Sequence, residues 1–309
     1  FGAINDGSVG LNFLWTPDFS SIWSPKVWLA AAGQIFFTLS VGMGSIQCYS
    51  SYVRKNEDIA LNAMSAGWMN EFVEVVVGSC ILIPIGIGYL GIDKIVEMTQ
   101  TGGLGLGFKT LPYLFQQWGP IMSVLAGLLW FGLLFFAGIT SSLAMGTPCM
   151  GFLQDEFGFS REKSAITFGI TIFILGLPTV LFFNHGVFFF FYYWAGTVSL
   201  VVFALLEIIL FGWVWGMQNG WREMNEGADI KIPGIMKIII KYVTPVFLGY
   251  VFIMSIPDIF AKLSDFSSLP VVASRAFLLL LWLTIAFLVR KAYYNRKKTG
   301  NFINKDLKI

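Results

Sequence analysis

Residues 37–45 read Phe-Thr-Leu-Ser-Val-Gly-Met-Gly-Ser and lie in the middle of an apolar run that extends from about Lys26 to Tyr52. Gly42 and Gly44 weaken a helix here, because glycine costs about 1 kcal/mol relative to alanine in a helix interior. If the run crosses a membrane, unwound backbone is tolerated only where it is buried in protein or lines a watery cavity. The stretch therefore predicts a helix broken halfway, with free amides and carbonyls that can hold a zwitterion or a small cation. The alternative is that these small residues let two helices pack closely.

The composition indicates that most of the chain lies in lipid. Of the 309 residues, 56% are apolar, 17% are aromatic and only 12% are charged, whereas a soluble domain carries about 25% charged residues. No charged residue occurs in 110–154 or in 164–206, which are gaps of 45 and 43 residues. A spanning helix needs about 20 residues. These values exclude a soluble globular protein, and a net charge of +2 leaves no basic footprint for a nucleic acid.

The hydrophobic pattern predicts an all-α integral membrane protein with seven transmembrane helices, the first of them broken mid-membrane. A long connection, 91–119, separates the second helix from the third because it is too polar or too interrupted to span. The seven helices are expected at about 26–52, 59–90, 120–153, 164–183, 188–215, 234–256 and 271–292.

Lysine and arginine counts predict the orientation of these helices. With the turn at 53–58 placed in the cytoplasm, that side holds fifteen basic residues and the other side five. Phe1 is therefore expected outside and Ile309 inside, in the inner (plasma) membrane. The predicted segments are an extracellular loop at 1–25, five helices at 26–215 with the extracellular connection 91–119, a cytoplasmic loop at 216–233, two further helices at 234–292 and a basic cytoplasmic tail at 293–309.

Carboxylates inside the second helix are candidates for function. Asn70 and Glu74 are four residues apart and share a helix face, and Glu71 follows Asn70 directly. Ionisable groups within a span are rare, and by default they point inward and serve a function. A structural hydrogen-bond anchor is the alternative for each glutamate.

The third helix carries a polar stripe formed by Ala137, Thr140, Ser141 and Met145, at spacings of three and four. The stripe places two hydroxyls on one face. Hydroxyl and carbonyl oxygens are hard ligands that suit an alkali cation better than a transition metal. The alternative is that both hydroxyls bond back to their own helix.

Enzyme chemistry finds no support in the sequence. The glycines of 103–107 resemble a dinucleotide loop, but neither a strand nor a βαβ unit accompanies them. His185 is the single histidine, and no base is expected beside a serine or cysteine nucleophile. Cys48, Cys80 and Cys149 lie in apolar stretches without the spacing of a disulfide framework or a metal cluster.

Five stretches resemble motifs of the neurotransmitter:sodium symporters, especially the bacterial amino-acid transporters. They occur in the family's order: 33–44 (GQIFFTLSVGMG), 49–55 (YSSYVRK), 105–112 (GLGFKTLP), 137–142 (AGITSS) and 194–197 (WAGT). The resemblance implies the leucine-transporter-like fold with its inverted repeats and broken helices. Since the family has about twelve spans, the chain resembles the sixth to twelfth. Residues 26–215 are then the second five-helix repeat of the transport core, followed by two peripheral helices, and five N-terminal helices are missing.

The same resemblance implies roles for individual residues. Phe37 would be an aromatic lid over the substrate, and Ser40, Met43, Ser141 and Met145 would shape its pocket. Thr38 and Asn70 would contribute to one sodium site, and the Ala137 carbonyl, Thr140 and Ser141 to a second. Glu74 matches the position at which chloride-independent bacterial members carry an acid. Tyr52 and Asp155 would belong to the cytoplasmic gate, whereas Tyr192 replaces the usual acid of the outer gate, so that a hydrogen bond or a cation–π contact is expected there instead.

The expected function is therefore the C-terminal portion of a sodium-coupled symporter that works by alternating access, not an enzyme. Its substrates are expected to be neutral, hydrophobic amino acids, because Met43 and Met145 adapt to bulky surfaces and no charged residue lies near them to pair with a charged side chain. Sodium is the expected coupling ion, with no organic cofactor and no chloride requirement. The alternative is a non-transporting membrane fragment or accessory subunit that keeps the fold.

Overall fold

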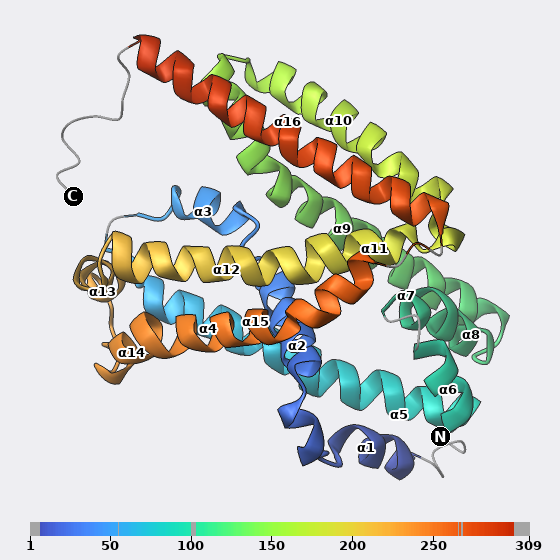
Figure 1. Ribbon diagram of the computed structural model, residues 1–309. Helices are drawn as coiled ribbons and strands as arrows, with labels where there is room; N and C mark the ends of the chain where they lie inside the picture. Colours follow the sequence, from blue (N-terminus) through green and yellow to red (C-terminus); the bar gives the residue numbers. More distant parts are fainter. Residues whose placement is uncertain (1–6, 55, 100–102, 265, 267, 300–309) are drawn as a thin grey trace. The chain divides into compact units, whose positions relative to one another are not determined.

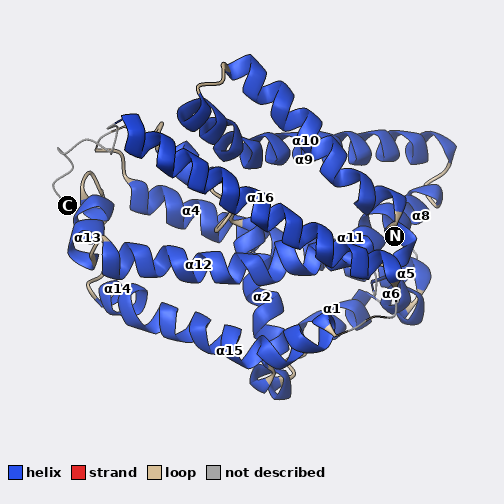
Figure 2. Cartoon of the chain, turned by 45° about the horizontal axis from the view of Figure 1, so that its top comes forward, coloured by secondary structure: helices blue, strands red, loops and turns tan. Residues whose placement is uncertain are grey.

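The structure is a computed structural model that describes residues 7–54, 56–99, 103–264, 266 and 268–299. These residues form helices joined by loops and turns, without a strand among them (Figure 2). The predicted outer end at Phe1 and the part of the basic tail at 300–309 lie outside the described residues. The all-α fold class is confirmed.

Six helices in the described residues are long and apolar enough to cross a membrane. The predicted first span is not among them because it is divided into α2 (Pro25–Thr38) and α3 (Ser45–Ser50), with 39–44 non-helical between them. The prediction of a broken first helix is thereby confirmed. The six long helices are Ile59–Gly88, Pro120–Phe157, Arg161–Leu181, Val187–Val214, Ile235–Leu263 and Leu269–Lys298.

Two helix ends differ from the expected positions. The sixth helix was expected to end before Pro257, but α15 (Thr244–Leu263) continues through this proline for six residues. Prolines are tolerated inside membrane helices, where neighbouring groups satisfy the carbonyl that loses its partner. The last helix, α16 (Leu269–Thr299), also runs beyond 292, so the predicted tail begins as helix.

The chain forms two compact units. Unit 1 comprises Phe1–Ser21 and Asn62–Ser142, and unit 2 comprises Ile22–Leu61 and Leu143–Ile309. Two helices pass from one unit into the other: α4 (Ile59–Glu71) and α9 (Pro120–Phe157).

In unit 1, α1 (Gly7–Trp15) packs against α5 (Ser79–Leu90), as Figure 1 shows. The connection after α5 is a series of short helices rather than a simple loop: α6 (Ile92–Thr99), α7 (Gly103–Gly105), η4 (Leu106–Thr110) and α8 (Leu111–Gln116). Leu111, Leu114 and Phe115 of α8 are buried together. The Nε1 of Trp130 in α9 donates to the carbonyl of Gly107, 3.1 Å away, and thereby fixes the connection to α9.

Unit 2 is built around α12 (Ser199–Ile209) and the π-helical turn before it, η6 (Trp194–Val198). Both α2 and α15 pack against α12 and against each other (Figure 1). Each helix contributes one fully buried residue to the centre of this arrangement, namely Leu29, Val201 and Val251. At the other end of η6, α11 (Val187–Tyr193) contacts α16 and α10 (Arg161–Leu181). The helix before the break, α2, is therefore held by its contacts with both α12 and α15.

Candidate functional site

The break between α2 and α3 has a backbone that a regular helix excludes. Three of its residues have positive φ angles: Ser40 at 56°, Gly42 at 76° and Gly44 at 78°. Glycine adopts this region freely, whereas Ser40 is strained there, because the left-handed conformation costs a residue with a side chain roughly 1–2 kcal/mol. Strained backbone of this kind is often found at functional sites.

The break leaves backbone groups free. Three backbone hydrogen bonds close the end of α2: the N–H groups of Leu39, Ser40 and Val41 donate to the carbonyls of Ile35, Phe37 and Phe36, at 3.0, 3.2 and 2.8 Å. Among the described residues, no group accepts from the N–H of residues 42–44, and none donates to the carbonyls of residues 39–43. Free N–H groups suit a carboxylate, and free carbonyls suit a small cation or an ammonium group.

The break lies close to neighbouring helices. A Cβ added to Gly42 would lie 3.1 Å from the Cβ of Phe203 in α12, and one added to Gly44 would lie 3.1 Å from the Cγ of Pro148 in α9. In the preceding helix, a Cβ at Gly33 would lie 2.9 Å from the Thr197 side chain in η6. Small residues therefore allow both α2 and the break to approach their neighbours closely. The glycines thus serve both predicted purposes, because they break the helix and also permit close packing.

Four of the predicted pocket residues lie in unit 2, together with Thr38 of the first predicted sodium site. Phe37 and Thr38 end α2, with Phe37 46% exposed and the Oγ1 of Thr38 donating to the Ile35 carbonyl at 3.2 Å. Ser40 and Met43 lie in the break itself and are half-buried. Met145 is 41% exposed. It lies three positions before Pro148, the residue of α9 that lies close to Gly44. Unit 2 therefore brings the break and the Met145 end of α9 into one region.

The predicted second sodium site lies on the part of α9 in unit 1. The Oγ1 of Thr140 is 2.8 Å from the Phe136 carbonyl oxygen and 3.1 Å from that of Ala137, and it donates to both. The Thr140 hydroxyl thus bonds back to its own helix, as the alternative had it for both hydroxyls. This bonding also holds the Ala137 carbonyl and the Thr140 hydroxyl close enough for both oxygens to face one cation. Ser141, the next residue, is exposed.

The polar group of the second helix also lies in unit 1. The Nδ2 of Asn70 is 3.5 Å from Oε1 of Glu71, and both side chains are half-buried. Glu74 lies one turn later, in the π-helical segment η3 (Phe72–Gly78). Such segments are often found at functional sites. Because Asn70 is in unit 1 and Thr38 in unit 2, their proposed shared sodium site stays a prediction.

The three predicted gate residues are all in unit 2 and all exposed. Tyr52 follows α3, and Asp155 lies in the last turn of α9. The ion pair at this end of α9 is made by the neighbouring Glu156, which accepts from Nε of Arg296 at 2.9 Å. Tyr192 stacks on Phe188 with 6.2 Å between ring centres and 20° between ring planes.

The model of one protein family, the sodium:neurotransmitter symporters, matches residues 2–296. The chain belongs to the sodium:neurotransmitter symporter family. Members of this family are sodium-coupled transporters and not enzymes, and the chain is accordingly a multi-pass membrane protein.

Several named transporters are similar to this chain. It is 29% identical over 243 residues to an uncharacterized sodium-dependent transporter of Methanocaldococcus jannaschii, a match covering 77% of this chain and 48% of the relative. It is 26% identical over 253 residues to the sodium-dependent nutrient amino acid transporter 1 of Drosophila melanogaster, covering 81% and 39%. The crystal structure of MhsT in complex with L-phenylalanine resembles it with a TM-score of 0.71 and 27% identity, covering 82% of this chain and 57% of MhsT. The chain thus spans about half the length of these proteins.

Three polar contacts of the chain were not predicted from the sequence. The Nε2 of Gln47 in α3 donates to Oε1 of Glu207 in α12 at 2.6 Å. The Nζ of Lys26, at the start of α2, lies 2.8 Å from Oδ1 of Asp258 in α15, and the hydroxyl of Tyr193 donates to the other carboxylate oxygen at 3.3 Å. The argument applied to Glu74, a carboxylate inside an apolar span, would also have identified Glu207. No local pattern pairs Lys26 with Asp258, because only the packing of α2 on α15 joins them.

Proposed function

We propose that the chain forms the sixth to twelfth spans of a sodium-coupled symporter for neutral, hydrophobic amino acids that works by alternating access. The observation that carries the proposal is the break at residues 39–44, with its free N–H and carbonyl groups. A zwitterionic amino acid has a carboxylate for the former and an ammonium group for the latter. The names of the relatives add support, since one is a nutrient amino acid transporter and another was solved with L-phenylalanine.

In this proposal, Phe37 covers the substrate, and Ser40, Met43, Ser141 and Met145 line its pocket. Thr38 and Asn70 contribute to one sodium site, and the Ala137 carbonyl, Thr140 and Ser141 to the other. Sodium and substrate must then raise each other's affinity by the same factor, because coupling between two binding sites is reciprocal.

The proposal also includes parts of the transporter beyond this chain. The remaining ligands of both sodium sites come from five preceding helices, so that the isolated chain does not transport. Tyr52 and Asp155 form the cytoplasmic gate, and Tyr192 takes the place of the acid in the outer gate. Phe1 faces the outside and Ile309 the cytoplasm, as the distribution of lysine and arginine indicates.

Uptake by the full-length transporter in liposomes tests the proposal. An inward sodium gradient should drive the uptake of labelled leucine, and unlabelled phenylalanine or tryptophan should compete with it, whereas lysine and glutamate should not. If lysine or glutamate competes better than phenylalanine, the pocket assignment is wrong. If sodium has no effect on either binding or uptake, the chain belongs instead to a non-transporting or accessory member that keeps the fold.

A further inference from the structure

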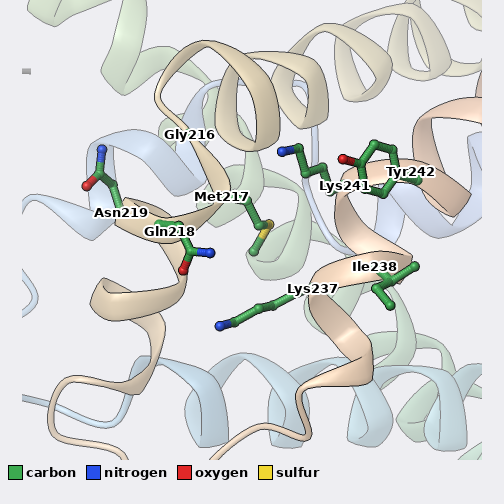
Figure 3. Close-up of a pocket in the computed structure, with 8 residues that line it drawn as sticks. All are labelled: Gly216, Met217, Gln218, Asn219, Lys237, Ile238, Lys241 and Tyr242. Carbon is green, nitrogen blue, oxygen red and sulfur yellow. The ribbon is translucent and has the colours of Figure 1, made fainter.

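A small basic pocket lies in unit 2, far along the chain from the break (Figure 3). It has a volume of about 290 Å³ and is bounded by the start of α13 (Met217–Asn225) and by the continuous helix formed by α14 (Ile235–Ile238) and the π-helical η8 (Ile239–Val243). Eight residues line it. Two of these are lysines, Lys237 and Lys241, and none is acidic.

The two lysines are held in position. They are four residues apart on one helix, at a spacing where like charges repel each other. The Nζ of Lys237 lies 4.8 Å from the centre of the Trp221 ring, and that of Lys241 lies 5.3 Å from the centre of the Tyr242 ring. Both side chains are half-buried, and neither forms an ion pair with another described residue. The pocket therefore holds two positive charges with no carboxylate in its lining.

The surroundings of the pocket are tightly built. The Nε1 of Trp213 donates to the carbonyl of Lys241 at 2.7 Å, which ties the lysine-bearing helix to the end of the preceding span. Met217 is buried and Gln218 exposed, and in the view of Figure 3 the Met217 side chain lies between those of the two lysines, with Gln218 beside it. The amide of Gln218 thus adds a hydrogen-bonding group to the lining.

An apolar groove begins where the basic pocket ends. It has a volume of about 530 Å³ and is lined by Tyr242, Val243, Val246, Phe247 and Tyr250, all of them exposed. Their spacing places them on one face of η8 and α15, and eight residues of helix rise about 12 Å. Tyr242 lines both the pocket and the groove, so a cationic end and an apolar stripe form one continuous surface.

We propose that this surface binds one anionic phospholipid. Its phosphate lies between Lys237 and Lys241, with Gln218 and the Tyr242 hydroxyl as further donors, and one acyl chain follows the groove toward Tyr250. On the orientation predicted from the sequence, 216–241 is cytoplasmic, so the lipid belongs to the inner leaflet, where basic pockets between membrane helices bind anionic headgroups. Lysines that only flank a membrane extend toward water, whereas these two are held over aromatic rings beside an apolar groove.

Native mass spectrometry of the full-length transporter in detergent tests this proposal. Phosphatidylglycerol should bind about tenfold more tightly than phosphatidylcholine with the same acyl chains, and excess inorganic phosphate should not displace it. The double variant Lys237→Gln/Lys241→Gln should lose about tenfold in affinity for phosphatidylglycerol. The matched control is Arg222→Gln/Lys231→Gln, which removes the same charge from two exposed residues outside the lining and should leave affinity unchanged.

Two further variants keep the test decisive if the glutamine variant folds poorly. Lys237→Arg/Lys241→Arg should retain binding, because the charge remains, and Val246→Trp should weaken it by filling the groove. Equal losses in the lining and control variants would reduce the effect to general surface charge and overturn the proposal. Displacement by phosphate, or equal binding of phosphatidylcholine, would overturn it as well.

Discussion

The side chain of Gln47 in α3 donates a hydrogen bond to the carboxylate of Glu207 in α12, with 2.6 Å between Nε2 and Oε1. Glu207 lies inside an apolar span, where an ionisable group normally has a specific partner. Gln47 lies on the helix that follows the break. The bond therefore joins the helix after the break to α12, which also packs against α2, the helix before the break.

We expect Gln47→Ala and Glu207→Ala each to lower the stability of the full-length transporter by about 1–2 kcal/mol, because each leaves a polar partner without its hydrogen bond. In the double variant the losses should not add, and the coupling should be about 1 kcal/mol. Thermal unfolding in detergent measures this cycle. Glu207→Gln is the matched control, since its amide oxygen still accepts from Gln47. Strictly additive losses would show that the contact contributes nothing.

Gly44→Ala should damage the break. Its φ of 78° is a conformation that costs a residue with a side chain roughly 1–2 kcal/mol, and the new Cβ would lie 3.1 Å from Pro148. We expect stability and substrate affinity to fall together, as measured by thermal unfolding and by binding of labelled leucine. Gly249→Ala is the control, because Gly249 is helical with no described atom within 4 Å of the added Cβ. Unchanged leucine affinity in Gly44→Ala would remove the break from the binding site.

Thr140→Val keeps the shape of the side chain but removes the hydroxyl that lies 3.1 Å from the Ala137 carbonyl. If both oxygens bind sodium, the sodium concentration for half-maximal uptake should rise about tenfold or more. Sodium titration of leucine uptake measures this shift. Thr147→Val is the control, since the Thr147 hydroxyl bonds back to the Leu143 carbonyl in the same way and lies outside the predicted site. An equal shift in both variants would indicate a general effect on α9.

Glu74→Ser should make uptake dependent on chloride. Under the proposed function, the Glu74 carboxylate would supply the negative charge that balances the bound cations, so that without it an anion would be needed. Leucine uptake in chloride and in gluconate buffers measures the dependence, and the unmodified transporter should behave alike in both. The control is Glu71→Ser, which removes a carboxylate next to Asn70 but outside the helix face that Asn70 and Glu74 share. A Glu74→Ser transporter that remains independent of chloride would leave Glu74 with a structural role.

Asp58 should stabilise the turn before α4 in a pH-dependent manner. Its carboxylate accepts hydrogen bonds from the N–H of Leu61 and from the N–H of Asp229, each 2.8 Å long. These bonds, chiefly the one from Leu61, hold the pKa of Asp58 below its usual value. A lowered pKa adds stability that is present above the unfolded-state value, about 4, and is lost as pH falls through the folded-state value. Asp58→Asn should therefore lower the melting temperature at pH 7, and this loss should be smaller at pH 3. Glu57→Gln, an exposed neighbour, should change neither, and an equal loss at both pH values in Asp58→Asn would contradict the ionic explanation.

The sequence by itself determined the membrane setting, the positions of the long helices and the broken first helix. These features depend on local properties: charge-free stretches longer than a bilayer is thick, and glycines within an apolar run. Helix ends near Pro257 were less predictable, because whether a proline ends a helix depends on which neighbours satisfy the carbonyl it leaves without a partner. Five short motifs together indicated the family, and the position two residues before Trp194 also indicated that Tyr192 departs from the usual outer-gate acid.

Only the tertiary structure decided which polar side chains meet. Lys26 and Asp258 are distant in sequence, and their pairing follows from the packing of α2 on α15 around Leu29 and Val251. Likewise, Tyr242 joins a basic pocket to an apolar groove only because the start of α13 lies against η8. Periodicity along one helix specifies a face, but the partner of that face is fixed by close packing between helices, which a single sequence does not encode locally.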